Sequence, residues 1–212
     1  TYEDKAGRRG IRAGDLLEDD VLRERLEYVV PQKRAVVEDV YGMDVRDLDN
    51  PEAFDVDALF EEFSDYGERF AEEGMAVNAS VFLTEKMDDG ENVMLEGAQG
   101  TTIDIDHGNY PYVTSSNPTA GGATTGTGLS PGVVGSGEVI GIVKAYLTRV
   151  GSGPLPTELG GVVGDTPGYE AQGEGENEEL ATDIREEGGE YGTVTGRPRR
   201  VAWLDMPMLR HA

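Results

Sequence analysis

A stretch rich in amide, hydroxyl and glycine groups is the part of this sequence whose residue types could do binding chemistry. It runs from Glu96 to Pro118 and follows the apolar residues 93–95, which we predict to form a buried strand. Its glycines and small hydroxyl side chains allow backbone N–H groups to approach a ligand closely. Because ligand-binding loops of open α/β sheets lie directly after strands, we expect a ligand site in this loop.

Gln99 is the residue of this loop best suited to recognise a base. A carboxamide carries an acceptor oxygen and two N–H donors, so it can bind the oxo and N–H edge of a purine. Gly97 and Gly100 would allow that close approach. The residues leave a second interpretation equally open, in which Gln99 braces its own loop.

Other polar residues of the loop are candidates for metal ligands or nucleophiles. Asp104, Asp106 and His107 are more typical of hydrogen-bonding groups in a tight loop than of a metal cluster, so we predict no metal site in this chain. Ser115 and Ser116 lack a surrounding nucleophile elbow, which favours phosphate ligands over catalytic nucleophiles.

A second candidate binding segment is basic. Residues 197–200 read Arg-Pro-Arg-Arg in a chain with 42 acidic and 18 basic residues. Planar guanidinium groups bind carboxylate and phosphate through paired hydrogen bonds, so we favour an anion site over surface salt bridges. None of the four lysines lies in a Gly-Lys-Ser or Gly-Lys-Thr phosphate loop, so this chain contains no Walker A motif.

The composition excludes several classes of protein. A formal net charge of -24 repels nucleic acid, and the absence of cysteine excludes disulfides and thiolate chemistry. No apolar run reaches the roughly 18 residues of a membrane span. The carboxylates are spread along the chain rather than gathered in one patch, which favours a solvated acidic surface of the halophilic type. We therefore expect a cytoplasmic, halophilic protein with no nucleic-acid or membrane partner.

Hydrophobic periodicity predicts helices and a strand–helix–strand unit ahead of the binding loop. Asn50 is the expected cap of the second helix, whose first residue is a proline. Two strands with a helix between them indicate a parallel βαβ unit. The predicted helices cover residues 16–29, 51–73 and 80–90, and the predicted strands cover residues 75–79 and 93–95.

The second half of the chain is expected to contain long loops. Residues 97–137 are dominated by small and polar residues, and an ordered loop of that length is usually functional. Residues 140–150 predict a further strand, and residues 164–189 predict an exposed acidic loop. Together these features predict an α/β fold: the central part of a mostly parallel sheet, with flanking helices and long ligand-binding loops.

Three blocks of this sequence resemble the adenylosuccinate synthetases, in the order that the family has them. They are residues 2–10 (YEDKAGRRG), residues 96–159, and residues 192–200 followed by Trp-Leu-Asp. Enzymes of this family use GTP to join L-aspartate to inosine monophosphate (IMP) in the biosynthesis of AMP, a purine nucleotide. The resemblance implies that residues 1–212 are the central segment of a single domain, and that the α/β fold is incomplete relative to the full family domain.

The resemblance implies an IMP site made of five residues. Gln99 would contact the 6-oxo group and stabilise the oxyanion formed there, as the one catalytic residue of this chain. Thr114 would hold the 5′-phosphate, and the backbone of Val150 would meet the ribose. Arg197 would lie near both the nucleotide and aspartate. Arg8 matches an arginine that reaches the phosphate from the neighbouring subunit, which implies a homodimer.

The same resemblance implies an aspartate-binding loop, in which Arg199 also lies near GTP. Pro198 and Val194 depart from the family pattern, which often has Arg and Thr at these places, but both arginines are present. The aspartate loop consists of Thr193, Val194, Thr195, Gly196, Arg197, Pro198 and Arg199.

The family's reaction uses GTP in two steps. GTP phosphorylates the 6-oxygen of IMP, and the aspartate amine then displaces that phosphate to give adenylosuccinate, GDP and phosphate. The family's phosphate loop, catalytic Asp and His, guanine-recognition segment and Mg²⁺ ligands find no match in this chain, so we expect the 212 residues alone to be inactive. Two alternatives stay open: a non-catalytic purine-phosphate binding module, and an acidic glycine-rich structural protein without a ligand.

Overall fold

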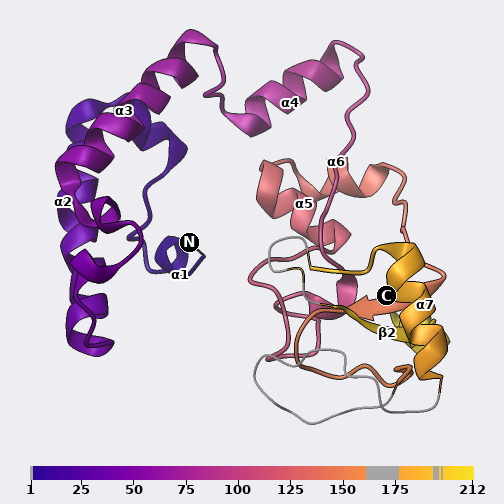
Figure 1. Ribbon diagram of the computed structural model, residues 1–212. Coiled ribbons are helices and arrows are strands. Elements are labelled where there is room, and N and C mark those ends of the chain that lie inside the picture. The colour runs from indigo at the N-terminus through magenta and orange to yellow at the C-terminus, as the bar shows by residue number, and fades with distance from the viewer. Residues whose placement is uncertain (1, 161–176, 193–195, 197) are drawn as a thin grey trace. The chain divides into compact units, whose positions relative to one another are not determined.

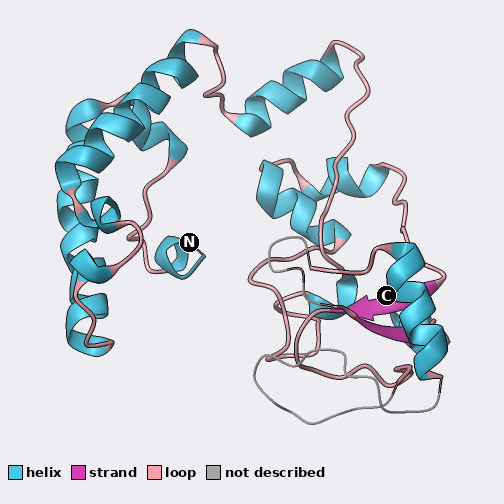
Figure 2. Cartoon of the chain, in the orientation of Figure 1, coloured by secondary structure: helices cyan, strands magenta, loops and turns pink. Residues whose placement is uncertain are grey.

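The chain folds into two compact units in a computed structural model: unit 1 spans residues 1–91 and unit 2 spans residues 92–212 (Figure 1). The structure describes residues 2–160, 177–192, 196 and 198–212. Unit 1 is helical, whereas unit 2 combines short helices with a small sheet and long loops (Figure 2). The elements are α1 (Tyr2–Ala6), α2 (Asp19–Ala35), α3 (Val56–Glu72), α4 (Ala79–Asp88), α5 (Ala120–Thr127), α6 (Pro131–Ser136), β1 (Tyr146–Arg149), α7 (Glu178–Gly188), β2 (Arg200–Trp203) and α8 (Met206–His211).

Unit 1 is built on the packing of α2 against α3. The apolar stripe of α2 places Leu22, Leu26 and Val30 in the core. Partly buried apolar side chains of α3 and of the turn before it pack against them. These are Phe54, Val56, Leu59, Phe60 and Phe63.

The helix predicted over residues 16–29 differs from α2 at both ends. α2 begins at Asp19, after a short 3-10 turn over residues 13–17. It continues through Pro31 to Ala35, although proline removes one backbone hydrogen bond from a helix interior. Val30, one turn beyond Leu26, is buried in the core, so apolar packing continues past the point where the sequence suggested an end.

The second predicted helix begins later than expected. Asn50 precedes only a 3-10 turn over Pro51–Phe54, and α3 starts at Val56. The cap is Asp55, whose carboxylate accepts hydrogen bonds from the N–H groups of residues 57 and 58 at 2.8 and 3.0 Å. The helix itself is confirmed, and its start moves to the residue that satisfies the first N–H groups.

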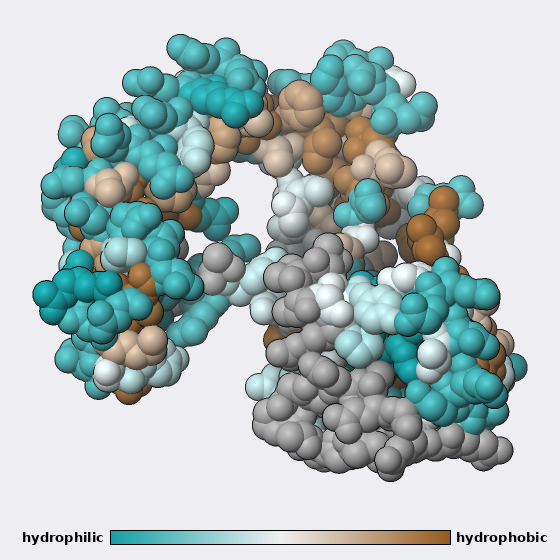
Figure 3. Space-filling model, viewed as in Figure 1, coloured by the Kyte–Doolittle hydropathy of each residue, from teal (hydrophilic) through white to brown (hydrophobic). Residues whose placement is uncertain are grey.

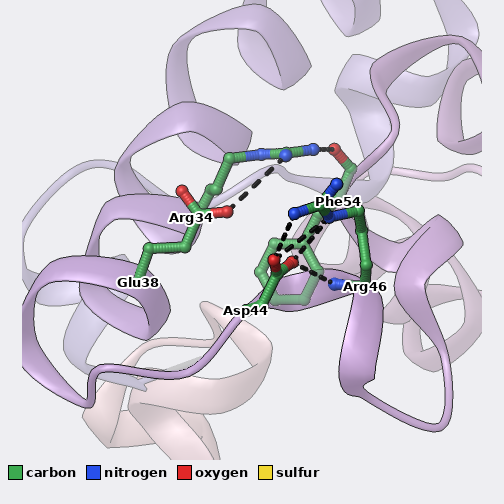
Figure 4. A network of polar contacts seen from close by, with 5 residues as sticks. All are labelled: Arg34, Glu38, Asp44, Arg46 and Phe54. Carbon is green, nitrogen blue, oxygen red and sulfur yellow. Dashed lines mark hydrogen bonds and ion pairs between the residues drawn. The ribbon is translucent and has the colours of Figure 1, made fainter.

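A polar network ties the segment between the two helices to the end of α2 (Figure 4). The guanidinium of Arg34 donates to the Phe54 carbonyl at 2.8 Å and lies 3.8 Å from the Glu38 carboxylate. Beside it, Asp44 accepts from the backbone N–H of Arg46 at 2.9 Å and pairs with the Arg46 guanidinium. One hydrogen bond, from Arg34 to the Phe54 carbonyl, therefore joins the connection to α2, in addition to the apolar contacts.

The strand–helix–strand unit expected ahead of the binding loop does not form. Its helix is confirmed as α4, which Asn78 caps through its side-chain oxygen. Residues 75–78 and 92–98 contain no strand, and the Met94 side chain is 84% exposed. A strand needs a neighbour for its backbone hydrogen bonds, and no described residue pairs with either segment. The prediction of strands at residues 75–79 and 93–95 is therefore wrong.

The sheet of unit 2 joins two segments that are distant in the sequence. β1 pairs antiparallel with β2, so that Arg149 lies opposite Arg200, and Leu159 adds a hydrogen bond from its N–H to the Val201 carbonyl (2.8 Å). Leu159, Val201 and Ala181 of α7 form the buried core of this unit. Among the described residues the pairing is antiparallel, in contrast to the parallel pairing that we predicted.

Two further predictions for unit 2 are confirmed only in part. The strand expected over residues 140–150 is limited to β1, and Ile142 before it is 96% exposed in an irregular segment. Of the acidic loop expected over residues 164–189, residues 164–176 lie outside the described residues. Residues 178–188 form α7 instead, because Ala181 and Ile184 give this segment an apolar face that packs on the unit 2 core.

Polar residues cover much of the described surface, although large apolar side chains such as Met94 and Ile142 are also exposed. Figure 3 shows hydrophilic residues covering most of the visible, described face of both units, in keeping with 42 acidic residues in the chain. Within the described residues, no helix combines the length and the apolar character needed to cross a membrane.

Gly67 offers a test of the contact between α3 and the turn before α2. A Cβ atom added at Gly67 would lie 1.9 Å from the backbone oxygen of Leu16, which cannot move away as a flexible side chain would. We expect Gly67→Ala to lower the free energy of unfolding by about 1–3 kcal/mol, although alanine favours a helix. Urea unfolding followed by circular dichroism measures this change.

Gly14→Ala is the matched control, because a Cβ atom at Gly14 would meet nothing within 4 Å. We expect that control to change the free energy of unfolding by less than about 0.5 kcal/mol. Equal stability of the Gly67→Ala variant and the parent chain would contradict the close approach.

Candidate functional site

A buried carboxylate organises the donor-rich loop of unit 2. Asp104 is fully buried, and its Oδ1 accepts from the backbone N–H groups of Asp106 (2.9 Å) and His107 (3.1 Å) and from Asn117 Nδ2 (3.1 Å). Its Oδ2 accepts from the Thr119 hydroxyl at 3.3 Å. One side chain thus joins the beginning of the loop to its end.

The hydrogen bonds around Asp104 also determine its charge. Burial by itself raises the pKa of the Asp104 carboxyl, but the N–H groups of Asp106, His107 and Asn117 outweigh burial, so the pKa lies below its ordinary value. The carboxylate is therefore ionised and engaged with its own loop. In the part of the chain that the structure describes, no three His, Asp or Glu residues lie together as a metal site would require.

Gln99 has the geometry of a ligand-binding residue. Its side chain is exposed, and its backbone φ of 66° lies in the left-handed region that non-glycine residues rarely adopt. Its carboxamide makes no hydrogen bond with another described residue, although a brace would need one. The geometry therefore favours a residue that faces a ligand, and strained backbone of this kind is common at binding sites.

Backbone hydrogen bonds hold Thr114 close to the start of the loop. The Thr114 N–H donates to the Ile103 carbonyl at 2.7 Å, and the Ile105 N–H donates to the Ser116 carbonyl at 3.1 Å. These two bonds place residues 103–105 beside residues 114–116. Thr114 itself is half-buried. The loop presents its hydroxyl groups from a backbone that is fixed at both limbs.

Arg149 links this loop to the turn that follows β1. Its Nη2 donates to the Tyr112 carbonyl at 3.0 Å, and its Nε donates to the Ser152 carbonyl at 2.8 Å. Val150, the expected ribose contact, lies between Arg149 and Ser152 in sequence and is 59% exposed. The structure thus connects the segments that carry Thr114 and Val150.

Arg200 belongs to the interior and does not form part of an open anion site. Its Nε donates to Glu158 Oε1 (2.8 Å) and its Nη2 to Glu158 Oε2 (2.5 Å), and both side chains are only 4% exposed. Its Nη1 donates to the carbonyls of Gly151 (3.1 Å) and Gly153 (2.8 Å). For Arg200, the prediction of an anion site is therefore wrong, because a buried carboxylate and two carbonyls occupy its donors.

Arg199 keeps the exposure that a binding residue needs. Its side chain is 28% exposed, and its Nη1 donates to Glu190 Oε2 at 2.8 Å. Its Nε is buried and has no hydrogen-bond partner among the described residues. Glu190 in turn accepts from Lys144 Nζ and from the Tyr146 hydroxyl, both at 2.7 Å.

The remaining expected site residues are only partly covered. Gly196 is exposed in the left-handed region (φ 64°), and Pro198 forms an isolated bridge with Tyr191. Arg8, in unit 1, is exposed and also left-handed (φ 59°). Four expected residues of the aspartate loop lie outside the described residues: Thr193, Val194, Thr195 and Arg197.

The sequence did not point to several polar residues that support the site. Glu158, Glu190 and Arg149 contact segments far from them in sequence, so no short motif reveals them. The chain has 42 acidic residues, and the side chains of Glu190 and Glu158 differ from most of the others in being buried, which the sequence does not show. A usable signal was the position of Glu190, just before the predicted aspartate loop.

The Asp104 hydrogen bonds predict an acid sensitivity of unit 2. Because its folded pKa lies below the ordinary value of 3.8, ionised Asp104 stabilises the fold fully above that pH, and the stabilisation is lost as the pH falls through the folded pKa. Near neutral pH, we expect the Asp104→Asn variant to melt at a lower temperature than the parent chain. Below pH 3.8 the difference between the two melting temperatures should become smaller. Thermal unfolding across a pH series measures this.

Asp183→Asn on α7 is the control for this series, since Asp183 is exposed in the same unit and its carboxylate makes no described hydrogen bond. The control should keep the acid response of the parent chain. A constant difference in melting temperature between the Asp104→Asn variant and the parent at every pH would contradict the role given to ionised Asp104.

A second test separates ligand and brace at Gln99. Glycine adopts the left-handed region freely, so Gln99→Gly should leave the free energy of unfolding unchanged or raise it by about 1 kcal/mol. Urea unfolding in high salt measures the change. A loss of stability in the Gln99→Gly variant would instead identify Gln99 as a brace.

Comparison with known proteins places the whole chain in one family. The adenylosuccinate synthetase family profile matches residues 1–212. Over 212 residues the chain is 82% identical to the adenylosuccinate synthetase of Haloarcula marismortui and 68% identical to that of Natronomonas pharaonis, covering all of this chain and 46% of each relative. The chain thus spans about half the length of these relatives. Their halophilic sources agree with the acidic composition.

A solved structure agrees with these matches. Fully ligated adenylosuccinate synthetase from Plasmodium falciparum superposes with a TM-score of 0.76 and 33% sequence identity, covering 98% of this chain and 41% of that one. This similarity confirms the α/β class and a partial family domain. The chain belongs to the adenylosuccinate synthetase family.

Proposed function

We propose that this chain forms the IMP and L-aspartate side of an adenylosuccinate synthetase, a GTP-dependent carbon–nitrogen ligase of AMP biosynthesis. The observation that carries the proposal is the Asp104-centred loop, which presents an exposed Gln99 without a described hydrogen-bond partner. The family membership of the chain supports the same reaction. A purine with a 6-oxo group matches the donors and acceptor of a carboxamide.

Gln99 acts on the 6-oxygen of IMP in this proposal. In the first step the N1 proton of IMP passes to a base outside the described residues, the 6-oxygen attacks the γ-phosphorus of GTP, and the bond between that phosphorus and GDP breaks. The Gln99 carboxamide donates a hydrogen bond to the 6-oxygen as negative charge develops there. In the second step the aspartate amine nitrogen attacks C6, the C6–O bond breaks, and phosphate leaves. The amine proton passes to a base outside the described residues.

The other residues bind and orient the substrates. Thr114 holds the 5′-phosphate of IMP, and the exposed backbone of Val150 contacts the ribose. Arg8 supplies a further phosphate contact from a second copy of the chain, so the enzyme acts as a homodimer. An exposed, left-handed Arg8 is consistent with a side chain that reaches outward.

The aspartate loop, residues 193–199, binds the carboxylates of L-aspartate. Arg197 and Arg199 offer planar guanidinium groups suited to paired hydrogen bonds with a carboxylate. Arg199 also approaches GTP. Mg²⁺ accompanies GTP in this proposal, with its ligands in parts of the family domain that this chain does not match. The acidic surface fits a halophilic cytoplasmic enzyme.

The proposal is testable in a hybrid synthetase. In this hybrid, the 212 residues replace the matching segment of Haloarcula marismortui adenylosuccinate synthetase, to which they are 82% identical. We expect the hybrid to form adenylosuccinate from IMP, L-aspartate and GTP in high salt. Gln99→Ala should lower kcat by on the order of 100- to 1000-fold, as removal of an oxyanion donor does in other enzymes.

Gln32→Ala is the matched control, because it removes a carboxamide from α2 in unit 1, where Gln32 only donates to the Tyr28 carbonyl (2.9 Å). This control should retain the kcat of the hybrid. A hybrid that forms no adenylosuccinate would overturn the proposed function, and full kcat in Gln99→Ala would remove Gln99 from the mechanism.

A further inference from the structure

A buried carboxylate lies directly behind Arg199. The Glu190 side chain is 4% exposed and accepts three charge-assisted or phenolic hydrogen bonds. Lys144 Nζ and the Tyr146 hydroxyl both donate to Oε1 at 2.7 Å, and Arg199 Nη1 donates to Oε2 at 2.8 Å. We call these four residues the Glu190 cluster.

Glu190 holds Arg199 through the backbone as well. The Arg199 N–H donates to the Glu190 carbonyl at 2.9 Å, and next to this contact Tyr191 and Pro198 form a bridge. These bonds close the base of the segment that contains the proposed aspartate loop. Glu190, three residues before the proposed loop, and Arg199, its last residue, are therefore joined by both main-chain and side-chain hydrogen bonds.

The carboxylate is in turn fixed to the sheet. Tyr146 is the first residue of β1 and packs against the unit 2 core. Its hydroxyl donates a hydrogen bond to the Glu190 carboxylate. The N–H of Glu190 donates to the Arg185 carbonyl at the end of α7 (2.9 Å). Two rigid elements thus determine where the Glu190 carboxylate points, and through it where the Arg199 guanidinium lies.

The charges of the cluster do not cancel. One carboxylate faces two cations, Lys144 and Arg199, which leaves one positive charge in a half-buried place. The Nε donor of Arg199 is buried and has no partner among the described residues. A buried, charged donor without a partner costs free energy, and an anionic ligand would supply the missing acceptor.

We propose that Glu190 is a positioning residue, which fixes the Arg199 guanidinium so that its remaining donors meet a carboxylate of L-aspartate. This inference rests on the proposed function and adds a residue to it. Glu190 itself touches neither substrate nor reacting atoms; it acts through Arg199. With Lys144 it also keeps one net positive charge at the loop base, which the substrate carboxylate balances.

A role in positioning predicts a defined kinetic signature. Glu190→Gln keeps the size of the side chain but removes the charge that orients Arg199, so the Michaelis constant for L-aspartate should rise by about tenfold. We expect kcat to stay within about threefold of the hybrid. The contact with aspartate is similar in the ground state and the transition state, and such a contact affects KM alone. The affinity for IMP, measured by calorimetry, should change by less than about twofold. The hybrid synthetase is the test protein.

The matched control is Glu178→Gln. Glu178 pairs with Arg185 on α7 at 3.1 Å and belongs to the same unit, and the same carboxylate becomes the same amide. Glu178 makes no described contact with the aspartate loop or with Arg199. This control should leave KM for L-aspartate within about twofold of the hybrid.

A double-mutant cycle separates positioning from general destabilisation. If Glu190 acts through Arg199, then adding Glu190→Gln to an Arg199→Ala variant should raise KM for L-aspartate by less than about twofold further. A merely structural role would give the full effect in both backgrounds.

The outcomes distinguish the two claims. An active hybrid whose KM for L-aspartate is unchanged by Glu190→Gln, or is changed equally with and without Arg199, overturns the positioning role and leaves the proposed function intact. A tenfold effect that disappears without Arg199 supports the positioning role. An inactive parent hybrid overturns the proposed function itself, and with it the basis for assigning Glu190.

Discussion

Burying a carboxylate costs free energy unless hydrogen-bond donors surround it, and unit 2 depends on three carboxylates that meet this condition. Asp104 accepts from both limbs of the donor-rich loop, Glu158 holds Arg200, and Glu190 holds Arg199. Each lies next to a segment without regular secondary structure. Asp104 therefore holds its own loop together, whereas Glu158 and Glu190 join irregular segments to residues of the sheet through ionic hydrogen bonds.

This arrangement suits a chain with little apolar material in the relevant region. Among the described residues of unit 2, the buried apolar cluster consists of Leu159, Ala181 and Val201, which is little apolar material to position forty residues of loop. Backbone N–H groups and carbonyls, in contrast, are available along every loop. A buried carboxylate or guanidinium can satisfy several of them at once, as Asp104 and Arg200 do.

The sequence predicted the helices of unit 1, which depend on residues close to one another in the chain. The helices α2, α3 and α4 follow from apolar spacing and nearby caps, and only their ends were misplaced, since Asp55 rather than Asn50 caps α3. The strands depended on partners elsewhere: residues 93–95 are apolar but unpaired among the described residues, whereas β1 pairs with a segment some fifty residues away. Composition predicted a binding loop, and it left ligand and brace equally open at Gln99; the backbone conformation and exposure of Gln99, which composition cannot give, favour the ligand contact.

Arg199 and Arg200 show what composition can and cannot predict. It indicated a basic segment, but it could not tell which arginine is buried and which is partly exposed. Arg200 is the first residue of β2 and Arg199 lies directly before the strand, and the two side chains meet different surroundings. Arg200 enters the interior, where Glu158 neutralises it and it fixes the turn at Gly151 and Gly153. Arg199 stays at the edge, where Glu190 must also serve Lys144. Glu158 pairs with Arg200 within the fold, whereas Glu190 is shared between Arg199 and Lys144, which is why we assign the proposed anion contact to Arg199 and not to Arg200.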